Sequence, residues 1–185
     1  MGLDIFLYKK NPRYTEEEAF ATYKALPYEI WKEMAEKQPE WKPIEEIAYW
    51  RKANMVHGFF MTCKGYWVEG IGNEDDHDCG YKHIPISELE RLLDTCKTIV
   101  DNGFNYNGKH LELTAENLEE KDAEDCKPFD IELCEEYLPT ERGFFYGSYD
   151  YDGWYLSDVV DTYEMLTKLK KDGEFSGDIY YHPWW

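Results

Sequence analysis

The sequence has few cysteines and no long apolar segment, and these two absences narrow the class of protein. The five cysteines are an odd number and include no CxxC pair, so we predict no disulfide framework. No apolar run approaches the length that crosses a bilayer, and the first residues lack the basic and apolar segments of a secretion signal. We therefore expect a cytoplasmic protein with reduced thiols that does not bind membranes directly.

The sequence also lacks the motifs of common enzyme and nucleotide-binding classes. The residues around Ser148 lack the final glycine of the G-x-S-x-G elbow found in serine hydrolases. No P-loop or dinucleotide-binding glycine fingerprint is present. Residues Glu74–Cys79 and His83 combine carboxylates, imidazoles and a thiol, but their spacing fits neither a calcium loop nor a zinc site. We predict no catalytic residues, no metal and no cofactor.

Basic residues are scarce, and the charge imbalance is confined to one part of the chain. The 185 residues include 20 Lys and Arg against 39 Asp and Glu, a net charge of −19 at pH 7. Residues 1–73 are close to neutral, with 10 basic and 11 acidic side chains. Residues 74–185 hold the other 10 basic and 28 acidic side chains. Such a field repels nucleic acids and anionic membranes and attracts basic surfaces or cations.

Aromatic residues are abundant, at 17% of the chain, and they argue against disorder despite the charge. A chain of this length is one domain and buries enough surface for a core of its own. We predict a single domain over residues 1–185, with a near-neutral first part (1–73) and a strongly acidic second part (74–185).

Apolar periodicity and turn residues predict an α+β fold, dominated by helices, with a small antiparallel sheet. The clearest element is a helix with apolar side chains along one face, where Ser87 and Glu90 form a capping box. Thr15 and Glu18 mark another helix start in the same way. The predicted helices cover 15–26, 28–37, 43–61, 86–100 and 157–173, the predicted strands cover 3–8, 143–148 and 178–182, and a strand or hairpin covers 65–72.

One predicted helix, over 43–61, brings three polar residues onto a stripe. Arg51, Asn54 and His57 cover about a third of its circumference, so they could converge on an anion or a nucleotide. Equally, they could satisfy buried backbone groups or pair with a carboxylate. A predicted turn near residue 151 carries two aspartates that could coordinate a ligand, although turn chemistry alone explains them. The possible ligand pocket consists of Arg51, Asn54, His57, Tyr146, Asp150 and Asp152.

The densest acidic stretch, residues 112–136, carries 11 acidic and 2 basic side chains. Duplex DNA presents one negative charge per about 1.7 Å of its axis. A domain of this length has a radius of gyration of about 16 Å, so its carboxylates could reproduce a short stretch of that charge density. The alternative is that they only keep the protein soluble. The candidate partner-binding surface consists of Glu74, Asp75, Asp76, Asp78, Glu116, Glu119, Glu120, Asp122, Glu124 and Asp125.

Four sets of residues give the chain a family resemblance. They are 1–4 with 8–10, 48–54 with His57, 138–140 followed by 143–148, and 151–152. With these residues the chain resembles the uncharacterised proteins of many bacteriophage and prophage genomes that open with MGLDM and carry YWRKAN and LPT..GFFFGS..YD motifs. It departs from that pattern at Ile5 and Tyr146. The resemblance implies a phage or prophage origin and assigns no site residues; small acidic phage proteins are often inhibitors of host defence.

Charge and resemblance together lead to one leading hypothesis. We expect a counter-defence protein of the bacterial cytoplasm that is not an enzyme. It would bind and inhibit a basic, nucleic-acid-binding host protein through an acidic surface that mimics DNA. A CRISPR effector of the Cas9 type is the partner to test first, which would make the chain an anti-CRISPR protein.

Two alternatives remain open. A pocket around Arg51, Asn54 and His57 would make the chain a binder or sponge of a nucleotide signal. The negative field opposes such an anion, unless the pocket is locally basic. As a second alternative, an enzyme would use Asp150, Asp152 and His57 as acid, base or metal ligands.

Overall fold

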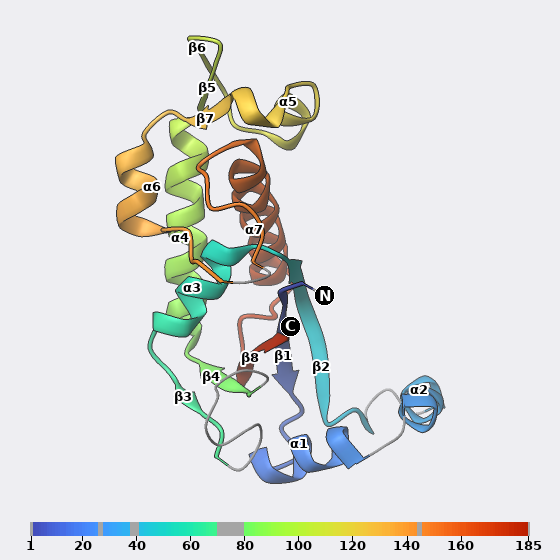
Figure 1. Cartoon of the computed structure of the whole chain (residues 1–185). Helices are drawn as coiled ribbons and strands as arrows, with labels where there is room; N and C mark the ends of the chain where they lie inside the picture. Colours follow the sequence, from blue (N-terminus) through green and yellow to red (C-terminus); the bar gives the residue numbers. More distant parts are fainter. Residues whose placement is uncertain (1, 26–27, 38–40, 70–79, 144–145, 185) are drawn as a thin grey trace.

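The chain forms an α+β structure built on two antiparallel sheets (Figure 1). This computed structural model describes residues 2–25, 28–37, 41–69, 80–143 and 146–184. Helix accounts for 46% and strand for 22%, so the predicted helix-dominated α+β class is confirmed. The strands form two sheets, where the sequence predicted one.

The larger sheet has five strands, and its centre joins the two ends of the chain. Its order is β2 (Ile44–Arg51), β1 (Asp4–Lys10), β8 (Ile179–Trp184), β4 (Lys82–Ile84) and β3 (Tyr66–Trp67). All pairs are antiparallel, and Ile5 of β1 lies opposite Trp50 on one side and Pro183 on the other. The strands predicted near residues 3–8 and 178–182 are confirmed, and they are neighbours.

Three helices pack on this sheet and enclose the main core: α3 (Asn54–Thr62), α4 (Ile86–Asn102) and α7 (Gly153–Lys171). The fully buried Ile5 and Leu7 of β1 belong to the same apolar cluster as these helices, and α4 packs against α7. Burying each large apolar side chain contributes about 1.5–3 kcal/mol, so this cluster is the main source of stability.

The helix predicted at 86–100 is confirmed as α4, although its start is not capped as predicted. The expected apolar face is buried and consists of Leu89, Leu92, Leu93, Cys96 and Ile99. The N-cap is Pro85, and no side chain makes a capping hydrogen bond there. The predicted capping box of Ser87 and Glu90 was therefore wrong, because the N-cap lies two residues earlier than that box requires.

A second, aromatic cluster lies under α1 (Glu16–Ala25). Phe20 packs on Tyr81 and, edge to face, on Tyr180. The predicted capping box is present, since Glu18 N–H donates to Thr15 Oγ1 and Thr15 N–H donates to the Glu18 carboxylate. The following helix, α2 (Tyr28–Lys37), also matches its prediction.

The smaller sheet and its neighbours form one end of the molecule, opposite α1 and α2 (Figure 1). Its strands are β6 (Lys109–Leu111), β5 (Phe104–Tyr106) and β7 (Cys126–Pro128), in that order. Beside it lie α5 (Ala115–Glu119), the 3-10 turn η2 (Ala123–Asp125) and α6 (Ile131–Tyr137). We call residues 112–136 the acidic lobe.

The helix predicted over 43–61 was wrong in its first half, which is strand β2. Ala48 and Trp50 are buried while Tyr49 and Arg51 are exposed, which is the period of two that a strand shows. The helix begins only at α3, because Lys52 has a φ of 60° that interrupts any helix running through it.

Two predictions near the end of the chain were also wrong. The described residues of 143–148 form no strand, and Gly147 has a φ of 93° there. Helix α7 begins at Gly153, earlier than the predicted start near Ser157. It starts there because the Asp152 carboxylate accepts hydrogen bonds from the N–H groups of Trp154 and Tyr155, which caps the helix.

Candidate functional site

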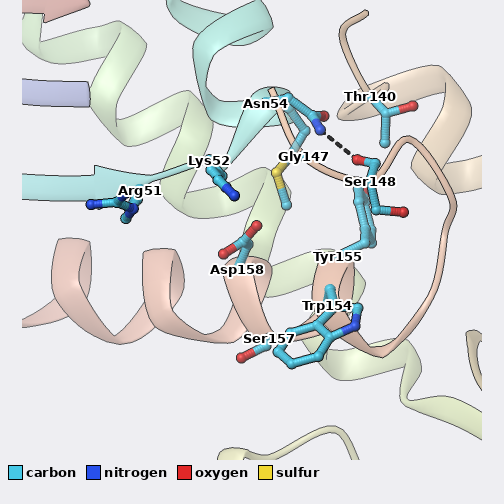
Figure 2. Close-up of a pocket in the computed structure, with 11 residues that line it drawn as sticks. Arg51, Lys52, Asn54, Thr140, Gly147, Ser148, Trp154, Tyr155, Ser157 and Asp158 are labelled. Atoms are coloured by element: carbon cyan, nitrogen blue, oxygen red, sulfur yellow. Dashed lines mark hydrogen bonds between the residues drawn. The ribbon is translucent and has the colours of Figure 1, made fainter. Parts of the chain in front are cut away.

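The candidate site is a cavity of about 460 Å³ where the end of β2, the start of α3 and the loop after α6 meet α7 (Figure 2). Drug-sized ligands occupy pockets of about 300–1,000 Å³, so the cavity suits a small molecule. Its lining consists of Arg51, Lys52, Asn54, Met55, Thr140, Gly147, Ser148, Trp154, Tyr155, Ser157 and Asp158.

Asn54 holds the loop that forms one wall of this cavity. Its amide nitrogen donates to the carbonyl oxygens of Tyr146, at 3.2 Å, and Ser148, at 2.6 Å. Its side-chain oxygen accepts from the N–H of Glu141 at 3.2 Å. The buried Asn54 thus joins three points of one loop, which fixes the position of that wall.

Two residues with positive φ bring the loop and the end of β2 close together. Lys52 N–H donates to the Leu3 carbonyl at 2.7 Å, which anchors the turn that contains Lys52. A Cβ atom on Gly147 would lie 3.4 Å from the backbone oxygen and Cβ of Lys52. Glycine is therefore favoured at position 147 for its φ of 93°, while the contact itself is at an ordinary van der Waals distance.

The opposite wall is α7, which two hydroxyl groups fasten to the rest of the site. Thr162 Oγ1 accepts from Trp50 Nε1 at 2.9 Å and donates to the backbone oxygen of Asp158 at 2.6 Å. The Tyr155 hydroxyl donates to the Leu138 carbonyl at 3.0 Å. These contacts tie β2, α7 and the loop after α6 together around the cavity.

Asp158 is the most perturbed group of the lining. Burial, together with the smaller effect of the nearby carboxylates of Asp161 and Asp152, raises its pKa to about 7. Among the described residues, no side chain donates a hydrogen bond to this carboxylate or forms an ion pair with it. Figure 2 shows it between the amino group of Lys52 and the indole of Trp154. Asp158 is therefore a partly buried carboxylate whose hydrogen-bonding capacity faces the cavity.

His57 lies behind the cavity wall in a chain of buried hydrogen bonds. Its Nδ1 is 2.6 Å from the Tyr181 hydroxyl and its Nε2 is 3.1 Å from the Tyr146 hydroxyl. Burial lowers the pKa of His57 to about 4, so the imidazole is neutral at pH 7. A neutral imidazole has one donor and one acceptor nitrogen, so one phenol donates to it and the other accepts. His57 thereby orients Tyr146.

The structure brings together only part of the pocket predicted from sequence. Arg51 and Asn54 line the cavity, whereas His57 and Tyr146 support its wall. Asp150 is exposed in the turn, where its N–H donates to Ser148 Oγ. The described residues of the three segments 48–54, 138–140 and 143–148 contribute to this lining.

Asp152 and the residues that sequence reasoning missed lie on or beside α7. Asp152 is buried and caps that helix. Trp154, Ser157 and Asp158 were missed because the predicted helix began near Ser157, which hid the part of α7 that faces the cavity. Lys52 was missed although it adjoins Arg51, because a continuous helix would have turned it away. Recognising Asp152 as the N-cap of α7 would have extended the predicted helix to include Trp154 and turned Ser157 and Asp158 toward the cavity.

The acidic lobe is the second candidate surface. All eleven of its acidic side chains are exposed, and its two basic residues are Lys121 and Lys127. Asp122 and Asp130 also cap η2 and α6. The lobe includes six of the ten predicted partner-binding residues, namely Glu116, Glu119, Glu120, Asp122, Glu124 and Asp125. The other four, Glu74, Asp75, Asp76 and Asp78, lie outside the described residues.

The lobe and the end of α6 next to it also present apolar side chains to solvent between the carboxylates. Phe129 is 55% exposed and stacks on His110, and Ile131 is 40% exposed. Tyr137, at the end of α6, is 54% exposed. Exposed aromatic residues among charges are typical of surfaces that dock on another protein.

Comparisons with protein-family models, with curated proteins and with solved structures found no match for this chain. Within the described part of the chain, no helix has the length and apolar character needed to cross a membrane. The same residues contain no group of three or more His, Cys, Asp or Glu placed to hold a metal ion.

Proposed function

We propose that this chain is a counter-defence protein that binds and inhibits a basic, nucleic-acid-binding host protein through its acidic lobe. The observation that carries the proposal is the lobe itself, in which eleven exposed carboxylates and two lysines occupy residues 112–136. The phage or prophage origin rests on the family resemblance. In this proposal the chain acts by binding and not by catalysis.

Charge and apolar contact have separate roles in this binding. The carboxylates attract a groove that evolved to hold phosphates, which accelerates encounter and selects basic partners. The exposed Phe129, Ile131 and Tyr137 provide area that loses water in the complex, which lengthens its lifetime. A CRISPR effector of the Cas9 type has such a groove and is the first partner to test.

The proposal predicts a strong dependence on salt. The Debye length falls from about 10 Å at 0.1 M to about 3 Å at 1 M, so exposed charge pairs lose most of their attraction. Binding should therefore weaken steeply between about 50 and about 500 mM salt. An affinity that stays flat over this range would remove the electrostatic basis of the proposal.

A second candidate function is the binding of a small anionic molecule in the cavity. The observation that favours it is local charge: the lining includes two cations from the near-neutral first part, Arg51 and Lys52, and one carboxylate, Asp158. With two cations in its lining, the cavity is less hostile to an anion than the rest of a protein of net charge −19. A rise in melting temperature on adding a panel of nucleotides, reduced in Arg51→Ala, would support it. A melting temperature that no nucleotide changes would exclude it.

A further inference from the structure

Three chemically different groups of the cavity lie in a fixed order. Arg51 and Lys52 supply positive charge at the end of β2, Asp158 supplies an acceptor, and Trp154 supplies a flat aromatic surface (Figure 2). Each selects a different part of a ligand. Cations hold an anion such as phosphate, a carboxylate accepts from N–H groups, and an indole stacks on a planar ring.

Trp154 is unusual because it is 66% exposed although it lies in the first turn of a packed helix. A second cavity of about 340 Å³, between α5 and α7, shares Trp154 and Ser157 with the first. The indole is therefore accessible from two cavities. An exposed ring between cavities is well placed for stacking, because little protein has to move to admit a ligand.

Asp158 is the residue of the cavity that would select one base over another. A partly buried carboxylate without a donor is unfavourable, and its raised pKa of about 7 reflects this. Figure 2 shows the amino group of Lys52 beside it and Arg51 farther along the cavity, and the carboxylates of Asp161, on the same helix, and Asp152, at its cap, act on it. A ligand that donates two N–H groups would satisfy both carboxylate oxygens.

We propose that the cavity binds a guanine nucleotide, with the base stacked on Trp154, two N–H groups of its edge donating to Asp158, and the phosphate held by Arg51 and Lys52. This inference rests on the second candidate function and names its ligand. Guanine is the one common base that presents two adjacent donors, the ring N–H and the exocyclic amino group. Adenine, cytosine and uracil each place an acceptor next to a donor on that edge, and this acceptor repels a carboxylate.

The volume of the cavity and the negative charge of the protein both favour a free nucleotide over a long nucleic acid. The cavity of about 460 Å³ lies in the range that holds small ligands. The net charge of −19 repels long nucleic acids, whose many phosphates would lie outside the two cations. A mononucleotide places its one phosphate against those cations.

The test is isothermal titration of the full chain with GMP, AMP, CMP, UMP, guanosine and inorganic phosphate. We expect GMP to bind at least tenfold more tightly than the other three nucleotides, because only guanine satisfies both oxygens of Asp158. Asp158→Asn should weaken GMP at least tenfold and leave phosphate unchanged or tighter. Arg51→Ala should weaken GMP and phosphate together, and guanosine should bind more weakly than GMP. Glu164→Gln, an exposed position on the same helix, is the matched control.

The outcomes separate this inference from the function on which it rests. Four nucleotides of equal affinity, or a GMP affinity unchanged in Asp158→Asn, would overturn the guanine assignment and leave a nucleotide pocket. Guanosine and GMP of equal affinity would overturn the role of the two cations. No binding of any nucleotide or of phosphate at millimolar concentration would overturn both the inference and the second candidate function.

Discussion

Replacing Asp158 by asparagine is expected to stabilise the folded protein, and by more at high pH than at low pH. The folded-state pKa of about 7 lies above the ordinary value of 3.8, so ionisation of Asp158 disfavours the folded state. The penalty is absent below pH 3.8 and grows until the pH passes 7. Each pH unit between the two pKa values is worth about 1.4 kcal/mol, so the penalty reaches about 4 kcal/mol at pH 8 and is about 2 kcal/mol at pH 5.

Urea unfolding at pH 5 and pH 8 measures this difference directly. The gain in unfolding free energy of Asp158→Asn over the wild type should be larger at pH 8 by about 2.5 kcal/mol. Glu164→Gln removes an exposed carboxylate from the same helix and should change stability little at either pH. If Asp158→Asn has the same effect at both pH values, Asp158 is not the desolvated carboxylate described above, and its place in the nucleotide site fails with it.

Three further predictions concern the walls of the cavity. Asn54→Ala removes three hydrogen bonds to the loop and should lower the free energy of unfolding by about 2–4 kcal/mol in urea titrations, whereas a loss near zero would show that the loop is held elsewhere. Gly147→Ala forces a side chain onto a φ of 93° and should cost about 1–2 kcal/mol by the same assay; an unchanged midpoint would contradict this left-handed conformation at position 147. Burial lowers the pKa of His57 from 6.5 to about 4, so the free energy of unfolding should fall by about 3 kcal/mol as the pH drops from 6.5 to 4. In His57→Gln, urea unfolding over the same pH range should no longer show this fall.

Elements with strong local signals could be predicted from the sequence. Helix α4 could be predicted without its tertiary contacts, because Leu89, Leu92, Leu93 and Cys96 recur with the period of a helix. Strand β2 could not be separated from helix in this way. Trp50, Ala53 and His57 fit helical spacing, while Ala48 and Trp50 fit a strand. The partner that decides between them, β1, lies some forty residues earlier in the chain.

The two candidate surfaces differed in how far composition could predict them. Exposure of the acidic lobe follows from its charge, because eleven carboxylates within 25 residues cannot be buried together. The cavity depends on three distant segments that meet only in the folded chain. Asp158 looks like any carboxylate of a surface helix until Lys52 and Trp154 are placed around it. Its position in the cavity could therefore be recognised only from the tertiary structure.

The most direct test of the central proposal is whether this protein displaces duplex DNA from a guide-loaded Cas9-type effector. Fluorescence anisotropy of labelled target DNA would be followed with the wild type and with a variant in which Glu116, Glu119, Glu120, Asp122, Glu124 and Asp125 are changed to the matching amides. A control variant would carry six amide changes at exposed positions off the lobe: Glu17, Glu36, Glu45, Glu46, Asp94 and Glu164. The proposal predicts displacement by the wild type and the control, and a loss of at least tenfold in the lobe variant. No displacement by the wild type, or equal displacement by both variants, would contradict it.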